Sequence, residues 1–359
     1  MTDSPEDQED REATLSAARY AGLQLPNRPR LAPWLIAVDL GDTRLQFRSA
    51  ESSHTLTHPL LARVFRRIER LLDGRHTVDD IVASVNADVL PTTVVFLLKL
   101  LQGKGLLQPG VGETTLDDNE QAPWRRQLRF LSHFVAEASS AQSMLAKARA
   151  GLVGSGDLQQ AILATIGSIG VGCITELGEP STWSIEARGE PASLDLIVAC
   201  EESPAFSFFD AVNRACLASG TRWLRVAISG TSAQLGPTVV PYQTACYTCL
   251  DLRIRTHEPE VDGYLAYRAQ IAALDTRSDE GYIAPLWSVV AGHVALEVMR
   301  LLTGFAPPVT VSRFYEFNAV SPAAISHDVL RVPRCPSCGR RRTFAEAWDQ
   351  SVLPMEVEP

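Results

Sequence analysis

The sequence predicts an α/β protein built from two folded parts. The chain has 359 residues, and at roughly 150 residues per domain this length suggests two domains. Short strand-like runs followed by amphipathic helices occupy residues 33–105, whereas strands and helices alternate from about residue 148 onward. The alternating pattern is typical of a parallel sheet covered by helices. With 45% hydrophobic and 21% charged residues, the composition is that of a globular protein.

The charge and the N-terminal sequence exclude several classes of protein. The 33 basic and 42 acidic residues give a net charge of −9, which disfavours non-specific binding to nucleic acid or to an anionic membrane. No stretch reaches 18 uninterrupted apolar residues, and the acidic start MTDSPEDQEDRE differs from a secretory signal. Seven cysteines without such a signal argue against a disulfide framework. We therefore expect a cytoplasmic protein with no nucleic-acid or membrane partner.

The first folded part is expected over residues 28–109, after a disordered acidic tail at 1–27. Three strand-like runs come first, with a turn at Leu40–Asp42 between the first two: PWLIAVDL, TRLQFRSA and SSHTLTH. Three helices are then predicted, over Leu60–Leu72, over Val78–Val85, and from Pro91 to near Gly103. Three strands followed by three helices indicate a small winged-helix-like module. Residues 110–124 are rich in polar and turn-forming residues, so they predict a linker.

The second folded part is expected over residues 125–345, before a C-terminal tail at 346–359. It begins with a helical stretch, Arg125–Ala150. The expected strands are ARAGLVGSG, VGCITELGE, SLDLIVACE and WLRVAIS, followed near the end by an antiparallel pair, VSRFYEFNAV and SHDVLRV. The expected helices are DLQQAILATIGSIG, PAFSFFDAVNRACLASG and PLWSVVAGHVALEVMRLLTG, the last ended by Gly304.

Two pairs of cysteines indicate a metal site. Each C-x-x-C pair can place two thiolates on one cation, and the pairs are Cys246 with Cys249 and Cys335 with Cys338. Four thiolates complete a tetrahedral zinc shell and leave no position for water, so we expect structural Zn²⁺. A redox pair and unpaired thiols are the alternatives. The remaining cysteines, Cys173, Cys200 and Cys216, lie in apolar segments and are interpreted as buried hydrophobic residues.

A glycine turn, Gly154-Ser155-Gly156, lies between a predicted strand and a helix, where a phosphate could be bound. The third glycine of a dinucleotide fingerprint is absent, since Leu158 and Gln159 follow Asp157, and Asp157 adds unfavourable negative charge. We place the end of the following strand at Leu177-Gly178, with Glu176 and Glu179 displaced, so that the acidic ribose ligand is missing. We interpret the turn as structural, with Gly154 and Gly156 as a degenerate, vestigial nucleotide site and ATP binding as the less favoured alternative.

Isolated polar residues carry weaker signals. His54 and His58 are expected to face solvent. Glu201 and Glu202 follow a parallel strand but point to different sides, so they do not predict an acid–base pair. Glu297 is expected to form an ion pair with Arg300. We therefore assign no catalytic residue.

Three segments carry a resemblance to a known family: LGPTVVPYQTACYTCLDLR, PLWSVVAGHVALEVMRLLTG and VLRVPRCPSCG. Together with the degenerate glycine turn and SLDLIVAC, they resemble the ThiF-like (ubiquitin-activating-enzyme-like) partner protein of the cyclodehydratases that make thiazole/oxazole-modified peptides, or TOMM bacteriocins. This resemblance covers roughly residues 30–345. The N-terminal module, with LLDGRHTVDDIVASV and LLKLLQGKGLLQ, is similar to the PqqD-type precursor-peptide recognition element.

The resemblance implies that a leader peptide adds as a strand to the module and packs on its third helix. The implied peptide-binding residues are Ser53, His54, Thr55, Leu56, Thr57, Val94, Val95, Leu98 and Leu101. For the helix residues, a place in the hydrophobic core is the alternative, and it is favoured for any single one of them. Because proline lacks an N–H, we expect Leu56→Pro to remove an edge donor and weaken leader binding.

The same resemblance implies a non-catalytic subunit. It would bind the leader of a ribosomally made precursor and present the Cys/Ser/Thr core to a YcaO-family, ATP-dependent cyclodehydratase that forms azoline rings. ThiF-like sheets also allow a homodimer. A ThiF-like adenylating enzyme acting on a peptide C-terminus is the alternative function. A winged-helix DNA regulator ranks last, because the module has only a small excess of basic residues.

Overall fold

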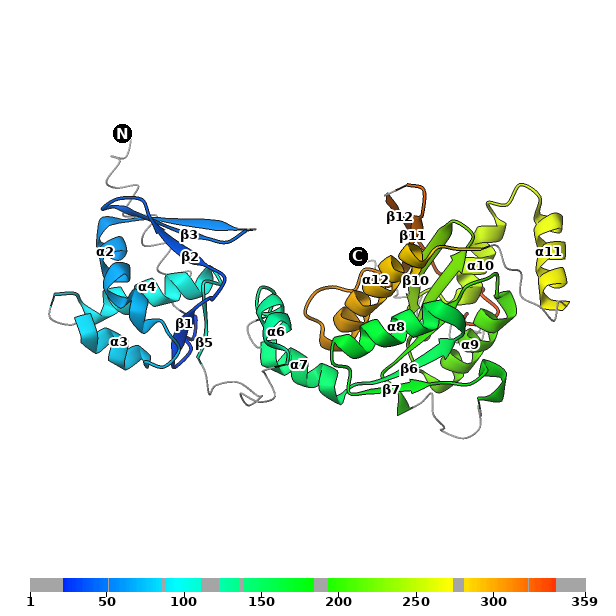
Figure 1. Cartoon of the computed structure of the whole chain (residues 1–359), viewed down its shortest axis with the longest axis horizontal. Helices are drawn as coiled ribbons and strands as arrows, with labels where there is room; N and C mark the ends of the chain where they lie inside the picture. Colours follow the sequence, from blue (N-terminus) through cyan, green and yellow to red (C-terminus); the bar gives the residue numbers. More distant parts are fainter. Residues whose placement is uncertain are drawn as a thin grey trace, which may run out of the picture. The chain divides into compact units, whose positions relative to one another are not determined.

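The computed structural model describes residues 22–50, 52–85, 88–110, 123–135, 138–183, 193–273, 281–321 and 323–339. The chain divides into two compact units, Met1–Ser143 and Met144–Pro359, each taken by itself below (Figure 1). The expected acidic tail up to residue 21, residues 111–122 of the expected linker and the expected C-terminal tail lie outside the described residues.

The first unit contains the three strands and three helices that the sequence predicts. An antiparallel sheet has the order β2-β3-β4, formed by β2 (Ile36–Asp39), β3 (Arg44–Arg48) and β4 (Ser53–Thr57). The helices are α2 (Pro59–Ile68), continued by a 3₁₀ turn at Glu69–Leu71, then α3 (Val78–Val85) and α4 (Pro91–Gly103). A second sheet, which the sequence did not predict, pairs β1 (Pro29–Leu31) with β5 (Leu107–Pro109).

The hydrophobic core of this unit joins the sheet to the helices. Leu45 and Phe47 of β3 are buried, as expected for alternate residues on one face of a strand. The ring of Phe47 meets that of Phe65 on α2 edge to face, with centroids 4.7 Å apart. The N-terminus of α2 is capped by His58, whose Nδ1 accepts the Leu61 N–H at 3.3 Å. His58 therefore stabilises a helix end, a role beyond the solvent-facing one expected for it.

The predicted helical stretch over Arg125–Ala150 is confirmed in two separate helices, and its predicted end is wrong because the second helix ends at Lys147. Two shorter helices occupy the described part of this stretch, α6 (Arg125–Leu131) and α7 (Ala138–Lys147). Arg149 already begins a strand, because the run that follows it pairs with two parallel neighbours in the larger sheet. Tertiary pairing thus overrides the helical propensity of the alanine-rich sequence.

The second unit is built on a seven-stranded sheet with the order β12-β11-β10-β9-β8-β6-β7 (Figure 1). Its strands are β6 (Arg149–Gly154), β7 (Cys173–Glu176), β8 (Leu196–Glu201), β9 (Trp223–Ser229), β10 (Ser232–Val239), β11 (Arg313–Asn318) and β12 (Ala324–Asp328). Strands β7, β6, β8 and β9 are parallel, and the other three add antiparallel. The predicted α/β fold is therefore confirmed.

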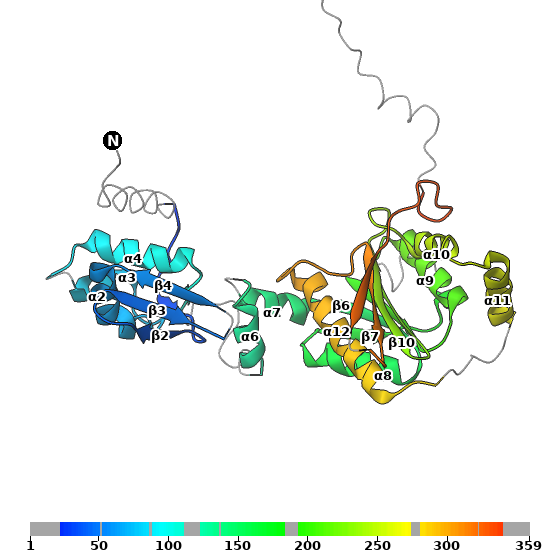
Figure 2. The same ribbon diagram turned by 90° about the horizontal axis from the view of Figure 1, so that it is seen from above.

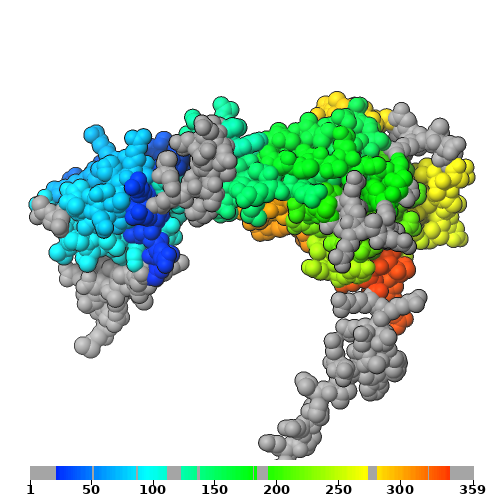
Figure 3. Space-filling model, turned by 90° about the horizontal axis from the view of Figure 1, so that it is seen from below, coloured from blue at the N-terminus to red at the C-terminus, as the bar shows by residue number. Residues whose placement is uncertain are grey.

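Helices cover both faces of this sheet. They are α8 (Gly156–Ser168), α9 (Phe206–Ser219), α10 (Tyr247–Arg255), α11 (Val261–Ala273) and α12 (Ala284–Thr303), with a 3₁₀ turn at Pro180–Thr182. Helices α8 and α12 lie side by side on one face, and α9 and α10 lie on the other (Figure 2). Between these layers every residue of β8 is buried, as expected for a central parallel strand. Helix α11 has no buried residue and projects from the surface of its unit, in yellow in Figure 3.

Helix α12 combines unusual length with apolar composition. Within the described residues it is the one helix long and apolar enough to cross a membrane, by length and composition alone. More than half of its apolar window, 56%, is buried inside the unit. The Thr165 hydroxyl of α8 also donates to the Ala291 carbonyl of α12 at 3.2 Å. Burial against α8 and the sheet accounts for the apolar character of α12.

Candidate functional site

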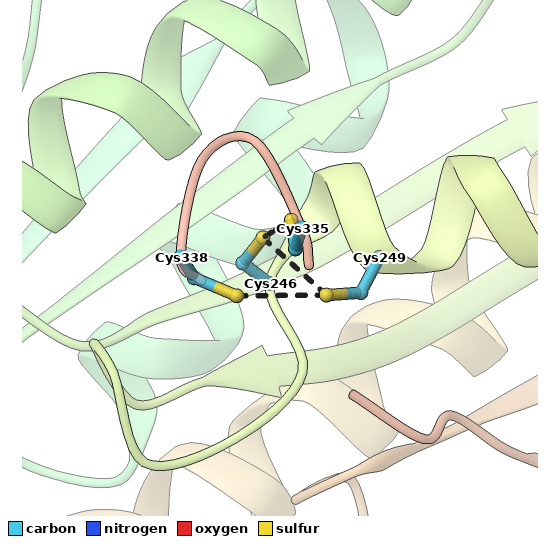
Figure 4. A group of neighbouring side chains, drawn as sticks. All are labelled: Cys246, Cys249, Cys335 and Cys338. Atoms are coloured by element: carbon cyan, nitrogen blue, oxygen red, sulfur yellow. Dashed lines mark hydrogen bonds between the residues drawn. The ribbon is translucent and has the colours of Figure 1, made fainter. Parts of the chain in front are cut away.

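The four paired cysteines come together at one end of the second unit. Cys246 is the residue before α10 and Cys249 lies in its first turn, whereas Cys335 and Cys338 lie in the loop after β12 (Figure 4). All four side chains are buried, and their sulfur atoms lie within 4.8 Å of one another. The loop thereby joins two segments that are 89 residues apart in the sequence.

The sulfur positions fit one tetrahedral cation. The Cys246 Sγ lies 3.9 Å from the Cys249 Sγ and 3.7 Å from the Cys335 Sγ. The Cys249 and Cys338 sulfurs are 3.5 Å apart. A Zn–S bond of about 2.3 Å in tetrahedral geometry requires sulfurs about 3.8 Å apart. The cluster can therefore hold one metal ion, and four thiolates would leave that ion no open position for substrate or water.

Hydrogen bonds within the cluster favour the thiolate form at Cys249. The Cys246 thiol donates to the Cys249 sulfur, which lowers the pKa of Cys249 to about 4, and the Val332 N–H supports the same sulfur at 3.4 Å. That shared proton raises the pKa of Cys246, and burial raises the pKa of Cys338 to about 11. The Cys249 sulfur, which accepts the hydrogen bonds from Cys246 and Val332, is thus disposed to act as a thiolate ligand.

Polar side chains connect the two cysteine turns to α9. The hydroxyls of Thr248 and Ser337, one from each turn, lie 2.7 Å apart. Buried Asn213 on α9 accepts the Tyr247 N–H at 3.1 Å and donates to the Thr248 hydroxyl at 3.3 Å. These contacts orient the first turn before any ion binds.

The other cysteines divide into two groups. Cys200 and Cys216 are buried, as expected, and burial raises the pKa of each thiol. Cys173 is exposed, so its predicted burial is wrong. It begins β7, a four-residue strand at the edge of the sheet, where the first side chain lacks a neighbouring strand to cover it.

The glycine turn lies, as predicted, between β6 and α8. Gly154 has a φ of +149° and Gly156 a φ of +82°, a left-handed conformation that suits glycine. A Cβ at Gly154 would collide with the Cys200 carbonyl oxygen, and one at Gly156 would collide with the Glu202 carboxylate. Close packing against the Cys200 backbone of β8 therefore requires Gly154, and the positive φ at Gly156 favours glycine there.

Glu202 places its carboxylate at the N-terminus of α8. One oxygen accepts the Leu158 N–H at 2.5 Å, and the other accepts the Tyr282 hydroxyl at 2.5 Å. The sequence offered no signal for this contact, because Glu202 is 44 residues from Leu158 and 80 from Tyr282. Its neighbour Glu201, the last residue of β8, is fully buried.

The expected absence of an acidic residue at the end of β7 is wrong. The strand ends at Glu176, which is paired with Leu152 of β6. The Gln159 side chain of α8 donates to Glu176 at 3.1 Å. Leu177 suggested a longer strand because it is apolar and buried, but it lies beyond the end of β7. The acidic strand end, one of the two features expected to be missing from a dinucleotide site, is therefore present. The third glycine is absent, and buried Gln159 occupies its position.

Strand β4 is at the edge of the small sheet, and its hydrogen-bond register is set by a tight hairpin. The Ser49 N–H donates to the Ser52 carbonyl at 2.9 Å, so Ser49 and Ser52 form a hydrogen-bonded pair at the turn. Bonded and non-bonded pairs alternate along an antiparallel ladder. Leu45 and Leu56 therefore form a bonded pair, and the backbone groups of Leu56 face β3.

The other residues of β4 direct their backbone groups away from β3. These are Ser53, Thr55 and Thr57, all with exposed side chains, whereas His54 and Leu56 are half-buried. The expectation that Leu56→Pro removes an edge donor is therefore wrong, because that N–H is used inside the sheet. The matching edge donor belongs to Thr55.

The helix residues implied in peptide binding differ in burial. Val94, Leu98 and Leu101 of α4 are buried in the core of the unit, and Val95 is half-buried. This burial matches the core alternative for the first three. Among the α4 residues that the resemblance implies in peptide binding, Val95 is the one with a partly exposed side chain.

The expected ion pair between Glu297 and Arg300 is present, at 3.2 Å. Fully buried Glu297 also accepts the Val309 and Thr310 N–H groups, each at 2.8 Å, and the Thr310 hydroxyl at 2.7 Å. It therefore fastens α12 to the segment before β11, a structural role.

Comparison with known proteins agrees with this architecture. Residues 185–339 match the ThiF family. Protein HesA of Leptolyngbya boryana is 27% identical over 160 residues, which cover 45% of this chain and 50% of HesA. The sulfur carrier protein ThiS adenylyltransferase of Escherichia coli K12 is 25% identical over 148 residues, covering 41% of this chain and 51% of that protein. The chain thus spans about half the length of these curated relatives.

Two solved structures share the fold over most of the chain. The heterocyclase TruD superposes with a TM-score of 0.66 at 20% sequence identity. The match covers 88% of this chain and 43% of the TruD chain. E. coli MccB with ATP superposes with a TM-score of 0.61 at 14% sequence identity. The match covers 87% of this chain and 99% of the MccB chain. The resemblance to ThiF-like proteins found in the sequence is therefore confirmed.

Proposed function

We propose that this chain, which carries a ThiF family domain at residues 185–339, is the peptide-binding subunit of a cyclodehydratase. It binds the leader of a ribosomally made precursor and presents the Cys/Ser/Thr core to a YcaO-family enzyme that uses ATP to form azoline rings. The observation that carries the proposal is the separate N-terminal unit with a strand edge at β4. The shared fold with a heterocyclase supports it.

The edge of β4 suits the addition of a peptide strand. Within the described residues, β4 pairs only with β3, so its other edge has no strand partner. The backbone groups of Ser53, Thr55 and Thr57 point toward that edge and can bond an extended peptide in a sequence-independent way. The half-buried side chains of His54 and Leu56 then supply shape and apolar contact, which give the bound peptide its register.

The remaining implied residues act from the side of α4. Val95 offers partly accessible apolar surface to the peptide, and buried Val94, Leu98 and Leu101 support the helix from beneath. A leader held here keeps the core peptide near the partner enzyme. Holding the leader raises the effective concentration of the core peptide at the partner enzyme, because their encounter becomes intramolecular.

The four-cysteine centre belongs to the same proposal as a structural zinc site. Cys246, Cys249, Cys335 and Cys338 would hold the ion and fix the C-terminal loop against α10. The bound ion would stabilise the folded second unit and would take no part in a reaction. We further propose a cytoplasmic protein that forms homodimers and binds neither nucleic acid nor membrane.

An ATP-dependent adenylating enzyme is the second candidate. The β6–turn–α8 arrangement and the acidic end of β7 at Glu176 favour it, as does the fold shared with MccB. The two candidates differ in ATP chemistry. Pyrophosphate–ATP exchange by the purified chain, abolished by changing Gly154 and Gly156, would favour the enzyme.

The test of peptide binding uses the N-terminal leader of the short Cys/Ser/Thr-rich precursor expected to be encoded beside this gene. Its labelled synthetic form is titrated with the full chain by fluorescence anisotropy. Thr55→Pro removes one edge N–H, and a hydrogen bond of about 0.5–1.5 kcal/mol corresponds to an affinity about twofold to tenfold weaker. Thr55→Val is the matched control, because it removes the hydroxyl but keeps the N–H.

The three variants separate strand addition from general damage. Thr55→Val should bind as the native chain does, whereas Leu56→Pro should lower the melting temperature because its N–H bonds to β3. Equal leader affinity of Thr55→Pro and Thr55→Val, with both folded by circular dichroism, would refute strand addition at β4.

A further inference from the structure

We infer that the acidic segment formed by residues 1–12 docks on a patch of arginines in the first unit, as an intramolecular clasp that other acidic polypeptides must displace. The patch consists of Arg30 on β1 and of Arg125, Arg126 and Arg129 on α6. We call these four residues the arginine face. This docking goes beyond the proposed function and is independent of leader binding.

Helix α6 is fixed beside the small sheet of β1 and β5. The Gln108 side chain of β5 donates to the Ser132 carbonyl, at the C-terminal end of α6, at 3.3 Å. The rings of Trp34, which follows β1, and of His133, which follows α6, stack with centroids 4.0 Å apart. These two contacts hold the arginines of α6 next to the strand that carries Arg30.

The positive charge of Arg30 has no carboxylate to balance it. Burial and then the neighbouring charge of Arg129 lower the pKa of Arg30. The Arg30 Nε–H is buried and has no acceptor, and its Nη2 donates to the neutral Gln108 side chain at 3.5 Å. None of the ion pairs of this unit within the described residues includes Arg30 or an arginine of α6. An anion that binds here would therefore relieve repulsion between like charges.

The three arginines of α6 extend this positive charge along the helix. All three side chains are exposed. Residues three and four apart lie on the same side of a helix, so Arg125 and Arg126 are neighbours of Arg129. Each guanidinium can donate two parallel hydrogen bonds to one carboxylate. The arginine face is thus suited to a polypeptide that carries several closely spaced carboxylates.

The N-terminal segment has the matching charge. Residues 1–12 contain six acidic residues and one basic residue, a net charge of −5. At physiological ionic strength, exposed charges attract one another over a Debye length of about 8 Å. A segment with this density of carboxylates can therefore contact several arginines of the face at once.

The segment is tethered within reach of the arginine face. The Asn27 carbonyl accepts the Val78 N–H at 2.9 Å, and Leu25 packs against the hydrophobic core of the same unit. Glu12 precedes Leu25 by 13 residues, and an extended chain of that length spans up to about 45 Å. A domain of about 100 residues has a radius of gyration of about 13 Å, so the segment can reach any part of the surface of this unit.

Tethering makes the clasp competitive although each contact is weak. An exposed ion pair changes affinity by a factor of about five at most. A tether of this kind gives the segment an effective concentration of about a millimolar at the face. A dissolved acidic peptide has to displace it, so the native chain should bind such a peptide less tightly than a chain whose segment has lost its charge.

The experiment titrates a fluorescein-labelled peptide with the sequence of residues 1–12 with two full-length chains and measures anisotropy. In the amide variant, every acidic residue of the segment becomes its amide: Asp3→Asn, Glu6→Gln, Asp7→Asn, Glu9→Gln, Asp10→Asn and Glu12→Gln. The amide variant should bind the peptide at least about tenfold more tightly than the native chain, because its own segment no longer competes. Raising NaCl from about 50 mM to about 500 mM should remove this difference.

Charge reversal identifies the site. In the amide variant, adding Arg129→Glu should weaken peptide binding by about tenfold, because an attraction becomes a repulsion. Arg126→Glu gives a second reading on the same helix and should also weaken binding. Arg63→Glu changes the net charge equally at an exposed arginine of α2 in the same unit, and this matched control should bind as the amide variant does. Circular dichroism confirms that each variant is folded.

Three results would overturn the inference. The first is equal peptide affinity of the native chain and the amide variant at low salt. The second is no binding of the peptide to either chain. The third is an equal loss in Arg129→Glu, Arg126→Glu and Arg63→Glu, which would mean that net charge alone attracts the peptide. Because the leader takes no part in this assay, none of these results bears on the proposed function.

Discussion

Loss of one thiolate from the four-cysteine centre should remove its metal ion and destabilise the second unit. Cys338→Ser replaces a buried ligand whose sulfur lies 3.5 Å from that of Cys249. The ion would close a loop of 89 residues, from Cys249 to Cys338. In the chain-entropy treatment of cross-links, closing a loop of that length is worth about 4–5 kcal/mol. For a unit of this size, such a loss lowers the melting temperature by about 10 °C or more.

The assay combines metal analysis with calorimetry. The native chain should carry one zinc ion per chain, and Cys338→Ser should carry less and melt about 10 °C lower. Cys173→Ser is the matched control, because Cys173 is exposed and is not a member of the four-cysteine cluster. Full zinc occupancy and an unchanged melting temperature in Cys338→Ser would refute the assignment of these thiolates as a metal site.

Two further predictions concern single carboxylates. Glu297→Ala should lower the free energy of unfolding by about 3 kcal/mol or more, because it leaves Arg300 and the N–H groups of Val309 and Thr310 without their acceptor. Chemical denaturation measures this, and a loss below about 1 kcal/mol would contradict it. The Arg75 N–H and then His76 hold the pKa of Asp73 to about 2, below its ordinary 3.8. The folded state then binds fewer protons than the unfolded state, so this stabilisation is full above pH 3.8 and disappears as the pH falls through about 2. NMR titration of the Asp73 carboxyl checks the shift, and a midpoint near 3.8 would disprove it.

Much of the fold was predictable wherever local signals agreed with tertiary contacts. The apolar run Trp223–Ser229 is β9, and the helix predicted to begin at Pro91 and to end near Gly103 is α4. Strand β10 was missed because Gly236 and Pro237 indicate a turn. In the structure both residues lie within the strand, where its pairing with β9 shifts register between Leu235 and Thr238. Pairing between β1 and β5 has no local signal, because each strand has three residues and they are far apart in sequence.

The candidate sites were predictable to different degrees. The two C-x-x-C pairs carry their own signal, and their four sulfurs meet as the spacing suggested. The contact of Glu202 with the glycine turn depends on strand order, which one sequence does not reveal. The choice between Thr55 and Leu56 as edge donor depends on the hairpin register at Ser49, a single-residue shift that composition cannot resolve.

Amide hydrogen exchange along β4, followed by NMR with and without the leader, tests peptide capture most directly. In the free chain the His54 and Leu56 amides should already be protected, because they face β3, and the Ser53, Thr55 and Thr57 amides should exchange fast. Saturating leader should slow exchange at Thr55 by about tenfold or more. Unchanged exchange at Thr55 in a chain that has bound the leader would contradict strand addition as the means of capture.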